Sequence, residues 1–198
     1  MSKDYNLRQQ LAQSLAPPVG LAIDRERIPQ AAVTILIREE DGDHQLLLIK
    51  RAIREGDPWS GHLALPGGRA EWQDIDLVET AARETCEEIG IDLLGPDSTR
   101  DRFIGHLPVL SPQSPGIPPI EITPLVAMAP PTQELRLSAE VCQTWWLSIN
   151  QLLERGLSTE YRHHSGSLVR KWPAYESPGG PVWGITERIL TTFLAIFK

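Results

Sequence analysis

The sequence predicts an α+β fold, in which strands and helices are mixed without a regular βαβ repeat. Two apolar runs, 31–37 and 45–49, flank a polar stretch that contains Asp41-Gly42, which is the pattern of a β-hairpin. The segment Leu77–Ile89 is the strongest helix candidate, and Gly90 follows it in the position that ends helices. Together these features predict a mixed sheet with at least one helix packed on it.

The other predicted helices and strands are shorter and follow from local sequence patterns. Residues 4–15 are expected to form a helix whose leucines share one stripe and which ends before Pro17-Pro18. Carboxylates at Asp74 and Asp76 are expected to cap the start of the 77–89 helix. Strands are expected at 62–65, 102–107, 120–128 and 145–147, a helical turn at 149–155, and a last helix from about 184 to the C-terminus. The chain is divided into an N-terminal helical arm, 1–29, and one domain, 30–198.

Composition excludes several classes of protein. The net charge of −7 argues against nonspecific nucleic-acid binding, which requires a basic surface. Two cysteines, Cys86 and Cys142, are too few for a disulfide framework and favour a reducing compartment. No apolar run is long enough to span a membrane, and the N-terminus lacks the features of a signal peptide. We therefore expect a cytoplasmic protein.

Three glutamates carry the main chemical signal. Glu84, Glu87 and Glu88 lie at i, i+3 and i+4 of the 77–89 helix, so they project from one face and repel one another. Taken alone, such a cluster is usually a solvated helix face. The alternative is a divalent cation bound among the carboxylates, and the neighbouring residues favour it.

The neighbours of the cluster suit a phosphate and a metal ion. Gly67 and Gly68 precede it and allow the backbone to approach a ligand closely. Arg83 is spaced to pair with Glu87 and hold its carboxylate. Carboxylate oxygens are ligands for Mg²⁺ or Mn²⁺, which also bind substrate phosphates. Glycine turn, helix and carboxylates together indicate a metal–diphosphate site.

The segment 67–91 resembles the Nudix box of the Nudix hydrolases, G-x5-E-x7-R-E-U-x-E-E-x-G-U, where U is a bulky aliphatic residue. Residues 83–91 read RETCEEIGI and depart from the box only at Thr85. The first half contains one extra residue, and Asp74 stands where counting forward from Gly68 places the box glutamate. This lengthened box is similar to that of the coenzyme A pyrophosphatase branch. The role of Asp74 stays open between a helix cap and the box acid.

Further segments, together covering about residues 30–198, are similar to the same branch. Residues 46–51 read LLLIKR and are followed by Ser60-Gly61-His62; Arg51 and Arg54 are candidate phosphate contacts there. The chain is longer at 56–59 than the branch motif. Downstream, residues 122–126 and the stretch Trp183-Gly184-Ile185-Thr186 are also similar to the branch.

The resemblance implies a Nudix fold, an α/β/α sandwich around a mixed β-sheet, and a hydrolase that cuts a diphosphate linkage with Mg²⁺ or Mn²⁺. It assigns catalysis to Arg83, Glu84, Glu87 and Glu88, metal binding to the three glutamates, and substrate binding to Arg51, Arg54, Gly67 and Gly68. The implied partner is a small nucleotide-like diphosphate, coenzyme A or a derivative first, with ADP-ribose, NADH or another nucleotide as alternatives. A homodimer is a further family-level expectation. A Nudix domain that binds a ligand without catalysis is the alternative of another class.

The remaining predictions concern residues outside the box. For Trp145 and Trp146 we expect packing in the core or in a dimer, whereas Trp59 lies in a loop and is a candidate base contact. The pair His163-His164 is not expected to bind metal, because adjacent side chains of a strand point apart. A general base is sought among glutamates outside the box, with Glu121 ranked before Glu134 and Glu140. The proline-rich stretch 108–119 is expected to wall a substrate groove.

Overall fold

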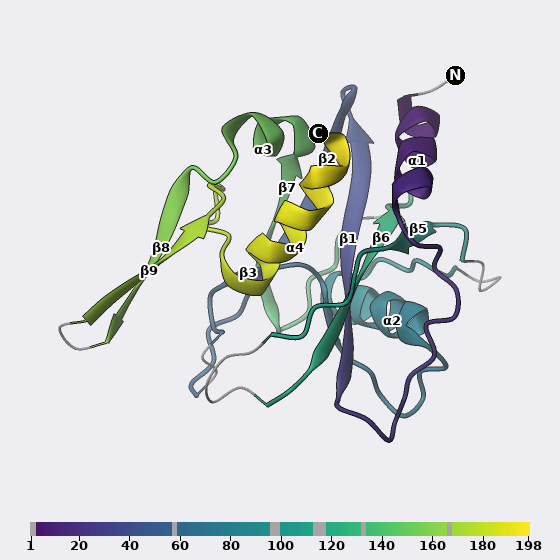
Figure 1. Ribbon diagram of the computed structural model, residues 1–198, viewed down its shortest axis with the longest axis horizontal. Coiled ribbons are helices and arrows are strands. Elements are labelled where there is room, and N and C mark those ends of the chain that lie inside the picture. The colour runs from purple at the N-terminus through teal and green to yellow at the C-terminus, as the bar shows by residue number, and fades with distance from the viewer. Residues whose placement is uncertain (1–2, 57–58, 96–99, 113–117, 132–133, 166–167) are drawn as a thin grey trace.

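A seven-stranded mixed sheet forms the centre of the molecule (Figure 1). The computed structural model describes residues 3–56, 59–95, 100–112, 118–131, 134–165 and 168–198. The strands of the sheet are β1 (Gln30–Glu40), β2 (Asp43–Arg51), β3 (Leu63–Ala64), β4 (Gly67–Arg69), β5 (Phe103–His106), β6 (Glu121–Met128) and β7 (Val141–Ser148). Strand β1 pairs with β6 in parallel and with β2 and β4 antiparallel. It therefore lies at the middle of the sheet.

Helices cover both faces of this sheet. Helices α1 (Lys3–Ser14), α3 (Ile149–Arg155) and α4 (Gly184–Leu194, continued by the 3-10 turn Ala195–Phe197) pack on one face, and α2 (Leu77–Ile89) packs on the other (Figure 1). Successive residues of β1 point to opposite faces, so Ile35 lies in the first core and Leu36 in the second. The expected α+β fold, a sandwich of helices around a mixed sheet, is confirmed.

The β1–β2 hairpin is present as the sequence predicts. Its turn residues Asp41 and Gly42 have φ values of 51° and 75°, and Glu40 pairs with Asp43. Two positive φ values are those of the turn type that matches the twist of antiparallel strands. The N-terminal helix also packs on the domain as expected. Leu7 and Leu11 of α1, and Leu15 directly after it, are buried in the first core.

Several features differ from the prediction. Strand β7 begins at Val141, because its pairing with β2 runs from Gln45 to Arg51 and is not confined to the tryptophans. Strands β8 (Thr159–Ser165) and β9 (Leu168–Ala174) form a separate two-stranded sheet that the sequence reading missed. This β8–β9 hairpin projects from the body at the left of Figure 1. The sequence of this hairpin contains no apolar run. The feature that could have indicated strands there is the alternation of ring side chains.

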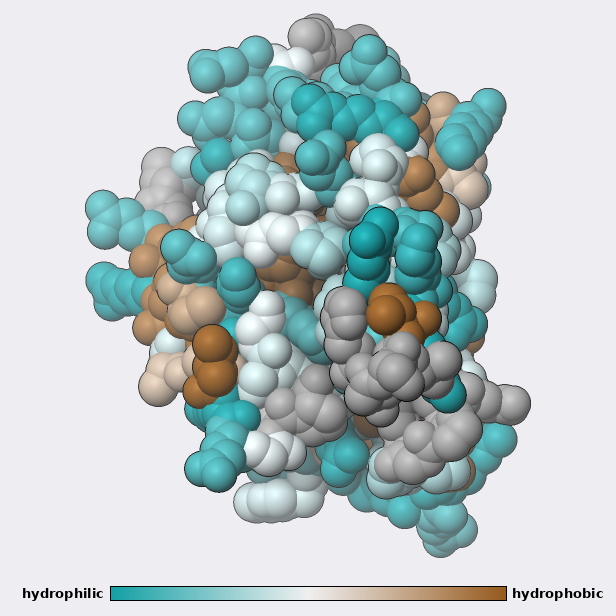
Figure 2. Space-filling view, turned by 90° about the vertical axis from the view of Figure 1, so that its left-hand side faces the viewer, coloured by the Kyte–Doolittle hydropathy of each residue, from teal (hydrophilic) through white to brown (hydrophobic). Residues whose placement is uncertain are grey.

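The surface on the side of the β8–β9 hairpin is mainly hydrophilic. Figure 2 shows hydrophobic residues there as small, separate spots among polar ones. Within the described ranges, no helix is both long and apolar enough to cross a membrane.

Candidate active site

Gly67 and Gly68 begin the short strand β4, which brings the backbone against β1 and α2. Gly67 has a φ of 149°, and a Cβ atom there would collide with the backbone of Ala32 and Val33. A Cβ atom on Gly68 would collide with the carboxylate of Glu84. Gly67 therefore requires glycine, whereas a side chain at Gly68 would displace the Glu84 carboxylate, so the turn lies directly beside the acidic face of α2.

Helix α2 is fixed at both ends. The Asp76 carboxylate accepts hydrogen bonds from the backbone N–H groups of Val78 and Glu79, at 3.0 and 3.1 Å. Gly90, with a φ of 74°, donates its N–H to the carbonyl of Cys86. These caps set where the helix starts and ends, and so fix the direction of its carboxylates.

Thr85 departs from the aliphatic preference of the box, and its surroundings explain why it is tolerated. It is fully buried between α2 and β1. Its hydroxyl donates to the carbonyl of Ala81 at 2.7 Å and lies 3.0 Å from the hydroxyl of Thr34. Because the buried hydroxyl is hydrogen-bonded, it does not carry the cost of an unsatisfied polar group.

The guanidinium of Arg83 joins three carboxylates. Its Nε and Nη2 atoms donate to the two oxygens of Asp74, at 2.9 and 3.0 Å. Its Nη1 atom donates to Glu84 at 3.0 Å and to Glu87 at 3.2 Å. The expected pair with Glu87 is present, but the two-pronged partner is Asp74. Hydrogen bonding to Asp74 raises the pKa of Arg83, so this side chain stays charged.

Asp74 is buried in the loop before α2 and does not cap that helix. Its carboxylate accepts hydrogen bonds from the N–H of Glu71 at 2.8 Å and from the hydroxyl of Thr80 at 2.9 Å. Burial raises the pKa of Asp74, but the bonds from Arg83, Glu71 and Thr80 outweigh it and hold the pKa below the usual value. The cap expected at Asp74 is therefore supplied by Asp76 alone, and Asp74 holds Arg83.

The three glutamates of the helix face differ in burial. Glu88 is 6% exposed and accepts a hydrogen bond from the N–H of Gly67 at 2.9 Å. Burial is the main reason that its pKa is raised to about 7, and the charge of Glu84 adds to it. Burial also raises the pKa of Glu84, against the opposing effect of Arg83. The side chain of Glu87 is 60% exposed. Two carboxylates thus face the glycine turn, and the third lies outside.

The donor chemistry fits a divalent cation. Glu84 is partly buried and Glu88 is buried, and both have pKa values raised mainly by desolvation and further by neighbouring carboxylates, Glu87 and Glu71 for Glu84 and Glu84 for Glu88. A bound cation would relieve both effects. In the described part of the chain, no group of three acidic, histidine or cysteine residues is already arranged as a metal site.

The two candidate phosphate-binding arginines have different surroundings. Arg51, at the end of β2, lowers the pKa of Glu88 by its charge and lines a cavity beside Gly67. Arg54 lies in the following loop and pairs with Glu140 at 3.2 Å. Glu140 in turn raises the pKa of Glu88. The structure thus brings Arg51 to the carboxylates and ties Arg54 to a neighbouring acid.

A cavity of about 250 Å³ opens beside the glycine turn. Its walls come from β1, the 59–67 segment and the start of α4, and include Trp59, His62 and Trp183. The expected groove wall at 108–119 does not line it, although residues 113–117 lie outside the described residues. Of the longer segment 56–59, Asp57 and Pro58 also lie outside them. Trp59 does reach the cavity, as a base contact would require.

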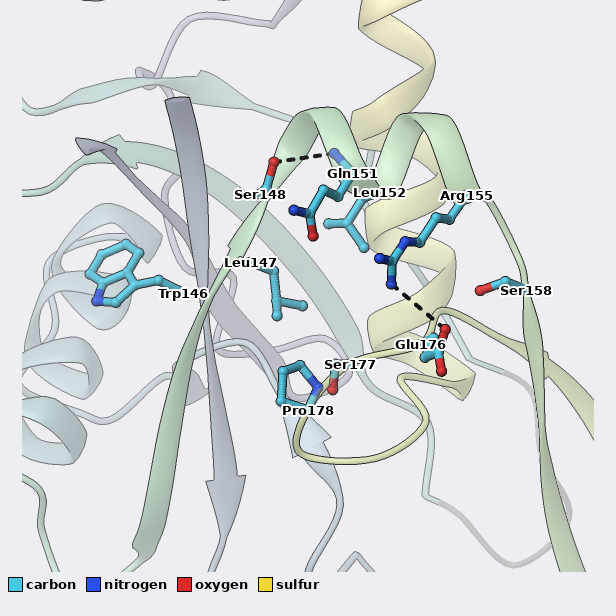
Figure 3. Close-up of a pocket in the computed structure, with 11 residues that line it drawn as sticks. Trp146, Leu147, Ser148, Gln151, Leu152, Arg155, Ser158, Glu176, Ser177 and Pro178 are labelled. Carbon is cyan, nitrogen blue, oxygen red and sulfur yellow. Dashed lines mark hydrogen bonds and ion pairs between the residues drawn. The ribbon is translucent and has the colours of Figure 1, made fainter. Parts of the chain in front are cut away.

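A larger cavity, of about 430 Å³, lies away from this site (Figure 3). It is bounded by α3, the end of β7 and the loop 176–178, where Arg155 pairs with Glu176 at 3.8 Å. Ser148 on its edge pairs with Gln45, six residues along β2 from Arg51, or about 20 Å in a strand. None of the box residues lines it, so it is not a candidate active site.

The remaining sequence expectations can now be placed. Trp145 packs against the first core and Trp146 against the second, as expected for core tryptophans. Arg38 lies over the ring of Trp146 at 4.3 Å. From the sequence, Trp183 and His62 are each recognisable only as part of a motif similar to the coenzyme A branch. Neither residue has a spacing signal, because α4 and the 59–67 segment meet only in the fold.

A pH dependence of stability follows from Glu88 in the metal-free protein. Its folded-state pKa of about 7 lies above the ordinary value of 4.5, so its contribution to stability is full below pH 4.5 and is lost as the pH rises through 7. Glu88→Gln mimics the protonated form. We expect the variant to gain about 3 kcal/mol relative to the wild type between pH 4 and 8, measured by urea unfolding in chelator. Parallel pH profiles of the two proteins would contradict the burial of this charge.

Arg83→Lys tests the role of the guanidinium. A lysine ammonium cannot make the two-pronged bond to Asp74 and also hold Glu84 and Glu87. We expect kcat to fall about a hundredfold while KM changes less than threefold, because the loss lies in carboxylate positioning rather than in substrate contact. Steady-state kinetics measure both constants, and a change confined to KM would show that Arg83 binds substrate instead.

Comparison with known proteins agrees with this geometry. The family model of the NUDIX domain matches residues 28–172. The uncharacterized Nudix hydrolase NudL of Salmonella heidelberg (strain SL476) is 30% identical over 183 residues, which cover 90% of this chain and 86% of NudL. Nudix hydrolase 15, mitochondrial, of Arabidopsis thaliana is 42% identical over 81 residues, 40% of this chain and 28% of that protein. The chain also covers 38% of an uncharacterized protein of Schizosaccharomyces pombe, at 35% identity over 64% of this chain.

Solved structures show the same fold. A MutT/nudix family protein from Enterococcus faecalis has a TM-score of 0.58 at 14% identity, covering 100% of this chain and 75% of that one. The NUDIX domain of Shewanella oneidensis NrtR, solved with ADP ribose, has a TM-score of 0.50 at 18% identity, covering 78% and 88%. Since the family model matches most of the chain, and a relative 30% identical is aligned over 90% of it, the chain belongs to the Nudix hydrolase family.

Proposed function

We propose that this chain hydrolyses the diphosphate linkage of a nucleoside diphosphate derivative. The observation that carries the proposal is the pair of carboxylates beside the Gly67-Gly68 turn, the buried Glu88 and the partly buried Glu84, both with raised pKa values. These two, with Glu87 as a third carboxylate, would hold Mg²⁺ or Mn²⁺. A bound cation would neutralise phosphate charge and make water a stronger nucleophile.

The protein residues have separate tasks in this proposal. Arg83 keeps Glu84 and Glu87 in place through its anchor on Asp74. Arg51, beside the glutamates and the cavity, binds a phosphate oxygen of the substrate. Gly67 and Gly68 leave room for the diphosphate against the backbone. Arg54 joins the substrate only if it leaves Glu140.

Glu140 becomes the leading candidate for accepting a proton from the attacking water. Its charge acts on Glu88, so it lies close to the reacting centre. Glu121 opens β6 opposite Gln30, and Glu134 lines a different cavity with Arg8 and Arg38. The order of candidates derived from the sequence, with Glu121 first, is therefore reversed in our proposal.

Coenzyme A or a derivative is the proposed substrate. The lengthened box and the Trp183–Thr186 stretch motivate it, and that stretch lines the cavity beside Gly67. The alternative substrates are ADP-ribose and NADH, and the ADP ribose bound to the NrtR domain supports them. A ligand-binding domain without catalysis is disfavoured, because Glu84, Glu87 and Glu88 are all present.

The deciding experiment is a substrate panel with Mg²⁺ and Mn²⁺, with products identified by mass spectrometry. Coenzyme A should give 3′,5′-ADP and 4′-phosphopantetheine, with a higher kcat/KM than dephospho-coenzyme A, ADP-ribose or NADH. If ADP-ribose or NADH is cleaved as fast as coenzyme A or faster, that compound, rather than coenzyme A, is the substrate. If no diphosphate is cleaved in the presence of either metal, the alternative of a ligand-binding domain without catalysis is favoured.

The proposed setting is a reducing compartment, the cytoplasm, which the two free cysteines Cys86 and Cys142 support. The partner is the small diphosphate substrate, and a homodimer remains part of the proposal.

A further inference from the structure

A series of contacting aromatic rings connects the cavity beside Gly67 to the β8–β9 hairpin. Trp183, in the cavity wall, stacks on Tyr161 of β8 with ring centroids 3.8 Å apart and planes 6° apart. Trp172 of β9 lies 5.3 Å from Trp183. The Tyr161 hydroxyl lies 3.3 Å from Nε2 of His62, another wall residue. The hairpin, which adds no strand to the central sheet, is therefore fastened to the cavity wall.

The size and lining of this cavity restrict what it can hold. A volume of about 250 Å³ is below the range of pockets that enclose a whole ligand, so it suits one arm of a substrate. Two polar groups of the wall are already engaged, since the Thr186 hydroxyl donates to the carbonyl of Leu63 and His62 meets Tyr161. The apolar part of the wall combines the rings of Trp59 and Trp183 with the aliphatic side chains of Val33, Leu63, Ala64, Leu65, Ile185 and Ile189.

This lining favours a flexible arm over a purine. A buried purine presents ring nitrogens and an amino group on a rigid edge, and each needs a hydrogen-bond partner in the wall. A pantetheine arm also carries two amides and a hydroxyl, but it can turn these toward the open side of the cavity and lay its methyl and methylene groups on the apolar wall. The Gly67 end of the cavity is close to Glu88, because the Glu88 carboxylate accepts a hydrogen bond from the N–H of Gly67 at 2.9 Å. Arg51 lines the same cavity, and the diphosphate would lie at this end. An arm attached to the diphosphate would then extend from Arg51 toward Trp183.

We propose that this cavity binds the uncharged, flexible arm on one side of the substrate diphosphate, the pantetheine arm of a coenzyme A-type substrate, and that Tyr161 positions its Trp183 wall. The inference rests on the proposed diphosphate hydrolysis. It makes the β8–β9 hairpin part of substrate recognition, with Tyr161 as a positioning residue that acts through the stack.

The test measures binding of the two product halves by titration calorimetry on the full chain, which requires no turnover. Tyr161→Ala removes the stacked ring and should weaken binding of 4′-phosphopantetheine about tenfold, while binding of 3′,5′-ADP stays within twofold. Tyr161→Phe keeps the ring and should restore binding. Arg162→Ala is the matched control, because Arg162 lies on the opposite face of β8 and pairs with Glu160.

A second variant leaves the hairpin untouched. Ile185→Asp puts a charge into the cavity wall at the first turn of α4, where a carboxylate suits the helix dipole. It should also weaken 4′-phosphopantetheine selectively, and both variants should raise KM for coenzyme A with kcat within twofold. The inference would be overturned if the variants lost binding of 3′,5′-ADP instead, or if they lost binding of both product halves equally. It would also be overturned if the wild type did not bind 4′-phosphopantetheine. Failure of the wild type to cleave any diphosphate would overturn the proposed hydrolysis separately.

Discussion

Glu84→Gln and Glu88→Gln are each expected to lower kcat about a thousandfold while the fold is retained. Glutamine keeps the shape of the side chain but removes the negative charge that a divalent cation requires. A thousandfold loss corresponds to about 4 kcal/mol of transition-state stabilisation, within the several kcal/mol that a metal ion supplies. Glu87→Gln should cost less, about tenfold, because that side chain is 60% exposed and lies outside the glycine turn.

The measurement is kcat as a function of Mg²⁺ and Mn²⁺ concentration, with far-ultraviolet circular dichroism as the check on folding. Glu79→Gln is the matched control, since it removes one charge from the first turn of the same helix, where Glu79 pairs with Arg100. Near-normal turnover of either Glu84→Gln or Glu88→Gln at limiting metal would remove that residue from the proposed metal site.

Elements with strong local signals were predictable from the sequence. The β1–β2 hairpin follows from two apolar runs around Asp41-Gly42, and α2 from its periodicity and the glycine that ends it. In both cases the signal lies within about twenty residues. The β8–β9 hairpin gave no such signal, because its half-buried rings Tyr161 and Trp172 pack against Trp183, which lies in another segment of the chain. Tyr161 also contacts His62 of the 59–67 segment.

The candidate site divides in the same way. The shared face of the glutamates and the Arg83–Glu87 pair follow from helix geometry alone. The burial of Glu88 against Gly67 does not, because it depends on how β4 packs on α2. Arg51 and Arg54 are three residues apart and looked equivalent, yet the first ends a strand and the second faces Glu140 from a loop.

Asp74 shows most clearly where local reasoning ends. Its position before a helix indicated a cap, and counting along the box indicated the missing acid. The loop from Glu71 to Asp76 turns the carboxylate inward, so that it meets Arg83 nine residues later. Arg25 steadies this loop from outside by donating to the carbonyls of Glu71, Trp72 and Asp74.

Asp74→Ala is therefore expected to destabilise the protein by about 3–5 kcal/mol, the cost of removing one partner of a buried ion pair. The side chains of Asp74 and Arg83 are 3% and 15% exposed, so water replaces little of what is lost. Turnover should fall as well, because Arg83 then lacks the anchor from which it holds Glu84. Urea unfolding at pH 7 and steady-state kinetics measure the two effects.

The pH dependence separates the ion pair from loss of packing. The folded-state pKa of Asp74 lies below the usual value of 3.8, so its stabilising contribution is present above that pH and is lost as the pH falls through the folded-state pKa. Asp74→Asn should consequently approach the wild type in stability at acidic pH and fall behind it near neutrality. A double-mutant cycle with Arg83→Gln should give a coupling free energy of at least 1 kcal/mol at pH 7. Additive losses in that cycle would show that the two side chains act independently and that Asp74 serves only the loop.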